Sequence, residues 1–251
     1  MAHAWDDHGL ILSVRRHGEH DAIISLLTEH NGRYAGLVKA GFSRRMKGSL
    51  QPGNALKATW RARLEEHLGT FTVEFLHSHS ADALTDPDKL AAMSSACALV
   101  DALLPERQPH PEIYAATLKL FEDFAQPHWL PRYAQWELEL LRDLGFGLDL
   151  SSCAATGSAE DLTYVSPRSG RAVSTAAAAP YAKRLLALPG FLRGEPGLPN
   201  VSDILSALAL TGHFFATHVF SPQHHAMPAA RERFVERLKR LEGQFVDSQI
   251  P

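Results

Sequence analysis

The sequence is short of cysteine and has no long apolar run. Only two cysteines, Cys97 and Cys153, occur among 251 residues, which excludes a disulfide framework as the basis of the fold. No stretch is long and apolar enough to span a bilayer, and no signal peptide is recognisable. These absences predict a reduced, cytoplasmic setting without membrane contact. Cys97 lies on an apolar helical stripe, so we expect it in the core.

The usual patterns of catalytic sites are also missing. No glycine-rich phosphate loop follows a predicted strand, and neither a Gly-x-Ser-x-Gly elbow nor a His-Glu-x-x-His motif occurs. Fourteen histidines would suit a metalloenzyme, but His77 and His79 on one predicted strand face, like His213 and His218 on a helix, lack a third ligand at a known spacing. We therefore expect no enzyme activity, no cofactor and no metal site.

Acidic residues are absent from residues 31–64, although the whole chain has a formal net charge of -3. A local excess of cations favours a polyanionic partner, because binding to phosphates releases condensed counterions. The alternative is a solvated basic face without a partner, and charge alone leaves both open. Nucleic acid is the first hypothesis. The candidate nucleic-acid-binding residues are the eight cations of this segment: Arg33, Lys39, Arg44, Arg45, Lys47, Lys57, Arg61 and Arg63.

The same region carries five strand signals. Apolar and β-branched residues between turn residues predict strands over residues 9–16, 22–28, 33–39, 55–64 and 69–79. Asn31-Gly32 predicts the turn between the second and third strands. In the fourth strand, Ala58 and Trp60 alternate with Lys57 and Arg61, so one face packs and the other is cationic. A five-stranded barrel with a basic face and a basic loop over residues 40–49 is the arrangement of an oligonucleotide-binding (OB) fold.

Three ordered segments resemble the start of the RecO family of bacterial recombination mediators. These are residues 9–12 with 15–23 (Arg-Arg-His-Gly-Glu-His-Asp-Ala-Ile), residues 27–33 (Leu-Thr-Glu-His-Asn-Gly-Arg) and residues 50–53 (Leu-Gln-Pro-Gly). The resemblance covers roughly the first eighty residues. It implies an OB-fold barrel that binds single- and double-stranded DNA and anneals complementary strands. It also implies partnership with RecR and single-stranded-DNA-binding protein in loading a RecA-type recombinase, near the bacterial nucleoid.

The hydrophobic period changes to that of helices near residue 80. Asp86-Pro87 predicts an N-cap followed by proline at the first helical position. We therefore expect an α+β protein, with an OB-fold domain over residues 1–80 and a mostly helical domain over residues 81–251. The predicted helices after the first are residues 112–124, 131–144, 180–188, 201–220 and 228–241.

A small insert at about residues 150–178 interrupts the predicted helices. The family resemblance implies a four-cysteine zinc module here, with ligands near Cys153, Thr156, Ser174 and Ala177. Only Cys153 of these can ligate, and one thiolate does not hold a structural zinc ion. The sequence therefore predicts a zinc-ribbon-like insert that lacks its cysteine set and holds no metal.

The helical part offers one candidate partner site. Arg132 precedes Tyr133 and Trp136, which we expect in the core, and Arg142 follows about one helix turn or more beyond. An apolar slot rimmed by such cations suits an acidic peptide with an apolar end. The resemblance implies the acidic tail of single-stranded-DNA-binding protein. Two other functions stay open: a protein adaptor for acidic tails, and an OB-fold RNA-binding protein.

Overall fold

The computed structural model describes residues 3–84 and 86–247, and it divides the chain into two compact units. The first unit is Met1–Pro127 and the second is His128–Pro251. No helix in the described ranges is both long and apolar enough to cross a membrane.

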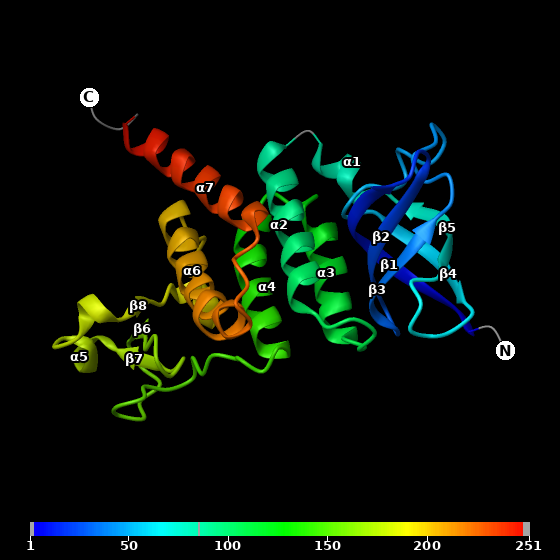
Figure 1. The fold of residues 1–251 in the computed structure, drawn as a ribbon. Helices are drawn as coiled ribbons and strands as arrows, with labels where there is room; N and C mark the ends of the chain where they lie inside the picture. Colours follow the sequence, from blue (N-terminus) through cyan, green and yellow to red (C-terminus); the bar gives the residue numbers. More distant parts are fainter. Residues whose placement is uncertain (1–2, 85, 248–251) are drawn as a thin grey trace. The chain divides into compact units, whose positions relative to one another are not determined.

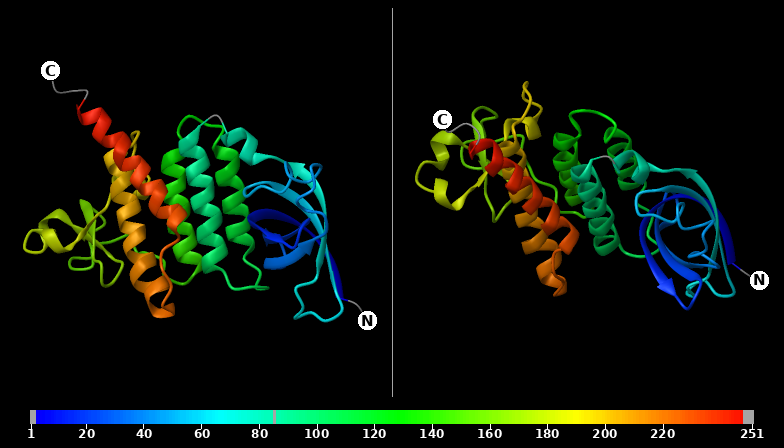
Figure 2. Two further views of the ribbon diagram at one scale, coloured as in Figure 1. Left: turned by 45° about the horizontal axis from the view of Figure 1, so that its top comes forward. Right: turned by 90° about the horizontal axis from the view of Figure 1, so that it is seen from above.

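The first unit begins with a closed barrel of five strands, most of which pair antiparallel (Figures 1 and 2). The five strands expected from the sequence are confirmed, and β3 and β5 pair parallel at Leu37 and Thr70. The first strand starts six residues earlier than expected, because residues 3–10 pair with β4. Residues 9–17 pair with β2, with a bulge between Ile11 and Ser13. The strands, in the order β1-β2-β3-β5-β4, are β1 (His3–His17), β2 (Asp21–Thr28), β3 (Gly32–Val38), β5 (Thr70–His77) and β4 (Ala55–Ala62).

The alternation predicted for the fourth strand is confirmed where that strand exists. Leu56, Ala58 and Trp60 are fully buried in the barrel, whereas Lys57 and Arg61 are exposed. Trp60 stacks on Trp5 with ring centroids 5.9 Å apart and meets Tyr34 edge-on at 5.0 Å. The strand ends at Ala62. Arg63 and Leu64 therefore lie in the bend that follows, and Leu64 is 45% exposed instead of inward-facing.

The predicted Asn31-Gly32 turn joins β2 to β3. Gly32 has a φ of 74°, and a Cβ atom there would lie 1.9 Å from the carbonyl oxygen of Gln108. Only glycine accepts both the backbone conformation and this close approach. Asp7 completes the turn from β1, because its carboxylate accepts hydrogen bonds from the backbone amides of His30 and Asn31.

The described residues of the first unit form three helices: α1 (His79–Ala83), α2 (Pro87–Leu103) and α3 (Pro111–Asp123). Asp86 caps α2 by accepting from the backbone amides of Asp88 and Lys89, as the sequence predicts. The helix packs on the barrel. Ser25 of β2 donates to Asp101 at 2.6 Å, and the buried Cys97 thiol donates to the Ile11 carbonyl at 3.6 Å.

The compact unit ends at Pro127, whereas the change of hydrophobic period predicts a domain boundary near residue 80. The change of hydrophobic period marks where strands give way to helices. On the buried face of α2, Met93 lies against Gly53 and Cys97 donates to the Ile11 carbonyl, so this face packs on the barrel. A boundary inferred from the period therefore separates secondary-structure types and does not follow the packing.

The second unit is built on α4 (Trp129–Asp143), α6 (Val201–Phe214) and α7 (Ala229–Asp247), with a π-helical turn over Phe215–Phe220 and a 3-10 turn over Ser221–Gln223. Tyr133 and Trp136 of α4 are fully buried, as expected. Asn200 caps α6 in a capping box with Asp203. Together α6 and the π turn cover the single helix expected over residues 201–220.

The insert of the second unit is a three-stranded sheet, whose order is β7-β6-β8. The expected helix over residues 180–188 is wrong: a 3-10 turn over Ala182–Arg184 leads into β8 (Leu186–Ala187), which pairs with β6. The Leu188 amide donates to the Thr163 carbonyl, so the sheet supplies the hydrogen-bond acceptor for this backbone N–H group. The other elements are β6 (Leu162–Val165), β7 (Ala172–Ser174), α5 (Thr175–Ala178) and the 3-10 turn Gly190–Arg193.

Candidate nucleic-acid interface

The basic loop between β3 and β4 presents its cations to solvent. Arg44, Arg45 and Lys47 are all exposed, while Leu50 is buried and Phe42 packs partly into the barrel core. The loop is ordered by successive turns, in which the Met46 amide donates to the Ser43 carbonyl and the Leu50 amide to the Met46 carbonyl. Apolar anchors at both ends thus hold the three charges outward.

The β1–β2 turn lies beside this loop, and the end of β1 adds a fourth cation. The Phe42 amide donates to the His20 carbonyl at 2.9 Å, and the Arg16 guanidinium lies 4.9 Å from the centre of the Phe42 ring. Sequence reasoning missed Arg16, although Arg15-Arg16 immediately before a turn was a usable signal. We call Arg16, Arg44, Arg45 and Lys47 the loop cluster. Exposed Glu19 in the β1–β2 turn is an acidic residue close to it in the chain.

The outer face of β4 is less basic than its sequence suggests. Lys57 and Arg61 are exposed, but Lys57 is paired across the strands with His8 on one side and Glu74 on the other. Thr59, between the two cations, donates to Asp6 of β1. The sheet therefore brings carboxylates from neighbouring strands beside the row of cations, which lowers the local positive potential.

The remaining candidates lie at the ends of strands or are held within the fold. Lys39 follows β3 and Arg63 follows β4, and both are exposed. Arg33 is different: its Nε donates to the Leu104 carbonyl at 2.7 Å, and Nη1 lies 3.5 Å from Asp101 and 3.4 Å from Glu106. With its side chain 18% exposed, Arg33 contacts the C-terminal end of α2.

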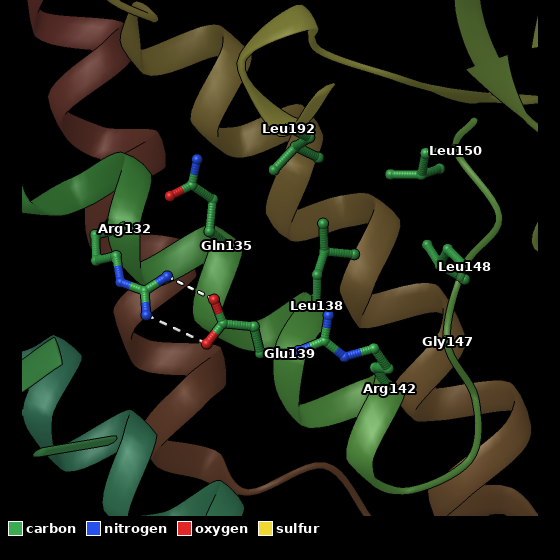
Figure 3. Close-up of a pocket in the computed structure, with 9 residues that line it drawn as sticks. All are labelled: Arg132, Gln135, Leu138, Glu139, Arg142, Gly147, Leu148, Leu150 and Leu192. Atoms are coloured by element: carbon green, nitrogen blue, oxygen red, sulfur yellow. Dashed lines mark hydrogen bonds and ion pairs between the residues drawn. The ribbon is translucent and has the colours of Figure 1, made fainter. Parts of the chain in front are cut away.

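The two candidate partner-binding arginines line one cavity of about 320 Å³ in the second unit (Figure 3). Arg132 of α4 makes a bidentate ion pair with Glu139, at 2.6 and 3.2 Å, and Arg142 lies further along the same helix. The apolar lining comes from α4, the segment after it and the 3-10 turn Gly190–Arg193. These apolar residues are Leu138, Leu148, Leu150 and Leu192.

The insert brings three of its four expected ligand positions together. The Cys153 sulfur accepts from the Ser174 amide at 3.3 Å and lies 3.5 Å from the Ser174 hydroxyl. Hydrogen bonds from Ser174 and Thr156 lower the pKa of the Cys153 thiol to about 6. Burial raises the pKa of the Cys97 thiol to about 12, in keeping with its expected place in the core.

The closed five-stranded barrel, with parallel β3 and β5 and followed by helices, defines the class of protein: an OB-fold-like barrel joined to a helical region. Comparison with protein families gives the particular family. Residues 1–79 match the model described as Recombination protein O N terminal, and residues 84–227 match the one described as Recombination protein O C terminal. The chain belongs to the RecO family, whose role is in recombinational DNA repair.

Individual relatives agree over nearly the full length. The chain is 51% identical over 238 residues to a DNA repair protein RecO of Rhodospirillum centenum, covering 94% of this chain and 95% of the relative. It is 47% identical to that of Rhodospirillum rubrum, with 94% and 96% covered, and 48% identical to that of Jannaschia sp., with the same shares covered. The resemblance seen in the first eighty residues is thereby confirmed for the whole chain.

Proposed function

We propose that this protein binds DNA phosphates through the loop cluster and thereby promotes annealing of complementary strands. The observation that carries the proposal is the exposed set of three loop cations, joined by Arg16 stacked on Phe42. The other exposed cations of residues 31–64 extend the surface at a lower density of positive charge. They are Lys39, Lys57, Arg61 and Arg63. Arg33 contacts the C-terminal end of α2, so we do not include it among the phosphate-binding residues.

The mechanism is electrostatic and needs no chemical step. Two DNA strands repel each other, and cations that contact the backbones of both lower that repulsion while the bases stay free to pair. Such a surface reads charge and not sequence, which suits a mediator that acts on any strand. The protein acts without catalysing bond formation or cleavage, and it needs no cofactor.

The cavity on α4 supports a second part of the proposal, a contact with an acidic protein tail. Leucines on one side offer burial for an apolar end group, and Arg142 offers a charge for a carboxylate. The partner we propose is the tail of single-stranded-DNA-binding protein. The protein then works with RecR at DNA coated by that protein and helps to load a RecA-type recombinase in the bacterial nucleoid.

The insert fits a zinc-ribbon-like module that has lost its metal. Hydroxyl and amide donors surround the single thiol, in positions where further thiolates would be required for a structural zinc ion. We propose that these hydrogen bonds, with the sheet β7-β6-β8, stabilise the insert without metal.

An annealing assay tests the proposed function. In the loop variant, Arg44, Arg45 and Lys47 are all changed to Ala; in the ribbon control variant, the exposed cations Arg168, Lys183 and Arg184 are changed to Ala. Both variants lose three positive charges. The proposal expects the loop variant to anneal complementary oligonucleotides much more slowly than the unmodified protein, and the control to keep its rate. Equal rates for the two variants would refute the assignment.

Two rival functions give different results in the same assay series. An OB-fold RNA-binding protein would prefer single-stranded RNA over DNA of the same length, and a pure adaptor would bind acidic peptides but show no salt-dependent binding of either nucleic acid. The repair role of the family and the exposed loop cluster favour DNA.

A further inference from the structure

A group of two histidines and one aspartate lies where the barrel meets its first helix. His77 ends β5, and His79 and Asp82 belong to α1, so the two histidines do not share a strand face as the sequence suggested. One ligand atom of each residue lies within 4.8 Å of the other two. His77 Nε2 is 2.9 Å from Asp82 Oδ2, and the imidazole rings of His77 and His79 meet edge-on, with centroids 4.5 Å apart.

His79 gives a second observation, independent of the spacing of the three residues. The residue is only 5% exposed, and its Nε2 atom is buried without a hydrogen-bond partner. Buried polar atoms in folded proteins are almost always paired, so an unpaired one needs an explanation.

Hydrogen bonds to Asn54 hold the backbone of residues 77–82 in place. Asn54 is fully buried, and its Oδ1 accepts from the Ser78 hydroxyl at 3.0 Å and from the Ser80 hydroxyl at 2.8 Å. The side-chain amide nitrogen of Asn54, Nδ2, donates to the Ser49 carbonyl at 3.1 Å. A polar network that fixes the backbone between His77 and Asp82 is the support that a preorganised ligand set requires.

We propose that His77, His79 and Asp82 form a binding site for a divalent transition-metal ion, with Zn²⁺ as the best match. Two imidazoles and a carboxylate are borderline ligands of the kind that Zn²⁺ takes, with a fourth position left for water. Ligand atoms on a tetrahedral zinc ion are about 3.4 Å apart, so the ion draws the three side chains inward. His77 and Asp82 are half exposed and have the freedom to do so.

A second group of possible ligands, Asp7, Glu29 and His30, serves as a contrast. The Asp7 carboxylate already accepts hydrogen bonds from His8, His30 and Asn31, including one from Asn31 Nδ2 at 2.7 Å. A metal ion there would have to displace donors that the fold supplies, whereas His79 Nε2 has no hydrogen-bond partner to displace. The sequence missed the first site because the third ligand, Asp82, comes from the helix that follows the strand.

Zinc titration of the full chain tests the site. Protein treated with chelator and dialysed is titrated with Zn²⁺ in competition with a chromophoric chelator. We expect one saturable site per chain, and an affinity lowered about tenfold or more in His77→Ala and in Asp82→Asn, since even the loss of an outer-shell partner commonly costs that much. Neither change removes a buried side chain, so circular dichroism in the absence of metal should be unchanged.

Two matched variants separate this site from other sources of binding. His17→Ala removes an exposed histidine at the end of β1, and Cys153→Ser removes the thiol of the insert; both should bind zinc as the unmodified chain does. The proposal is overturned if His77→Ala and Asp82→Asn keep full affinity, if no saturable site exists, if His17→Ala weakens binding equally, or if Cys153→Ser abolishes it. Co²⁺ gives a further check, because coordination by nitrogen and oxygen alone should produce no thiolate charge-transfer band.

Discussion

At the scale of single residues, the same side chain has opposite roles in different places. Arg44 and Arg45 are exposed, Arg33 is held by α2, and Arg231 is 5% exposed in the second unit. Arg231 makes two hydrogen bonds of 2.8 Å to the fully buried Glu137, which also accepts from the Thr211 hydroxyl. In sequence it belongs to a run of helical cations, and only the packing shows that it is unavailable to a partner.

The buried pair should be essential to the stability of the second unit. Arg231→Met leaves the Glu137 charge buried without its partner, and we expect a loss of about 3 to 5 kcal/mol in the free energy of unfolding. The double variant with Glu137→Met as well should recover much of that loss, since no buried charge then remains. Urea unfolding measures both. Lys239→Met, which breaks an exposed pair with Glu236, is the control, expected to cost less than about 1 kcal/mol; an equally small effect of Arg231→Met would contradict this account.

At the scale of secondary-structure elements, the sequence predicts well where one pattern dominates. The alternation of β4 and the Asp86-Pro87 start of α2 are local signals, and both are confirmed. Residues 180–188 are predicted as a helix, but pairing of Leu186 and Ala187 with β6 decides their structure. Such short strands depend on a distant partner, so their own residues do not encode them clearly.

The candidate sites likewise combine features that follow from the local sequence with features that depend on distant neighbours. The exposed loop cations follow from local sequence, because turn residues and charge place them at the surface. The stacking of Arg16 on Phe42 and the carboxylates beside Lys57 depend on which strands and turns are neighbours. Both cavity arginines of α4 were singled out in advance, yet the ion pair of Arg132 with Glu139 was not.

The α4 cavity gives a prediction at this scale. An acidic peptide with an apolar terminal residue should bind the full chain, and deletion of that residue should cost about 1.5 to 3 kcal/mol if the side chain is buried among the leucines. Arg142→Ala should weaken binding, whereas Arg184→Ala, which removes an exposed cation elsewhere, should not. Fluorescence anisotropy of the labelled peptide measures both. Equal affinities for intact and truncated peptide would indicate only nonspecific charge attraction.

At the scale of the whole molecule, the total charge of -3 says little about partners, because the positive charge is concentrated in one segment. The order of the architecture, barrel first and helices second, was predicted from the change of period near residue 80. The extent of the packed units was not, because α2 carries helical residues whose buried face is completed by the barrel.

The salt dependence of DNA binding tests the central claim most directly. For the unmodified protein, the loop variant and the ribbon control variant, the dissociation constant of a single-stranded oligonucleotide is measured over a series of salt concentrations. Each phosphate contact on a single strand contributes about 0.7 to the slope of log affinity against log salt, so the loop variant should lose about 2 from that slope, and the control should lose almost nothing. An unchanged slope in the loop variant, with the fold intact, would contradict the claim that the loop cluster holds the phosphates.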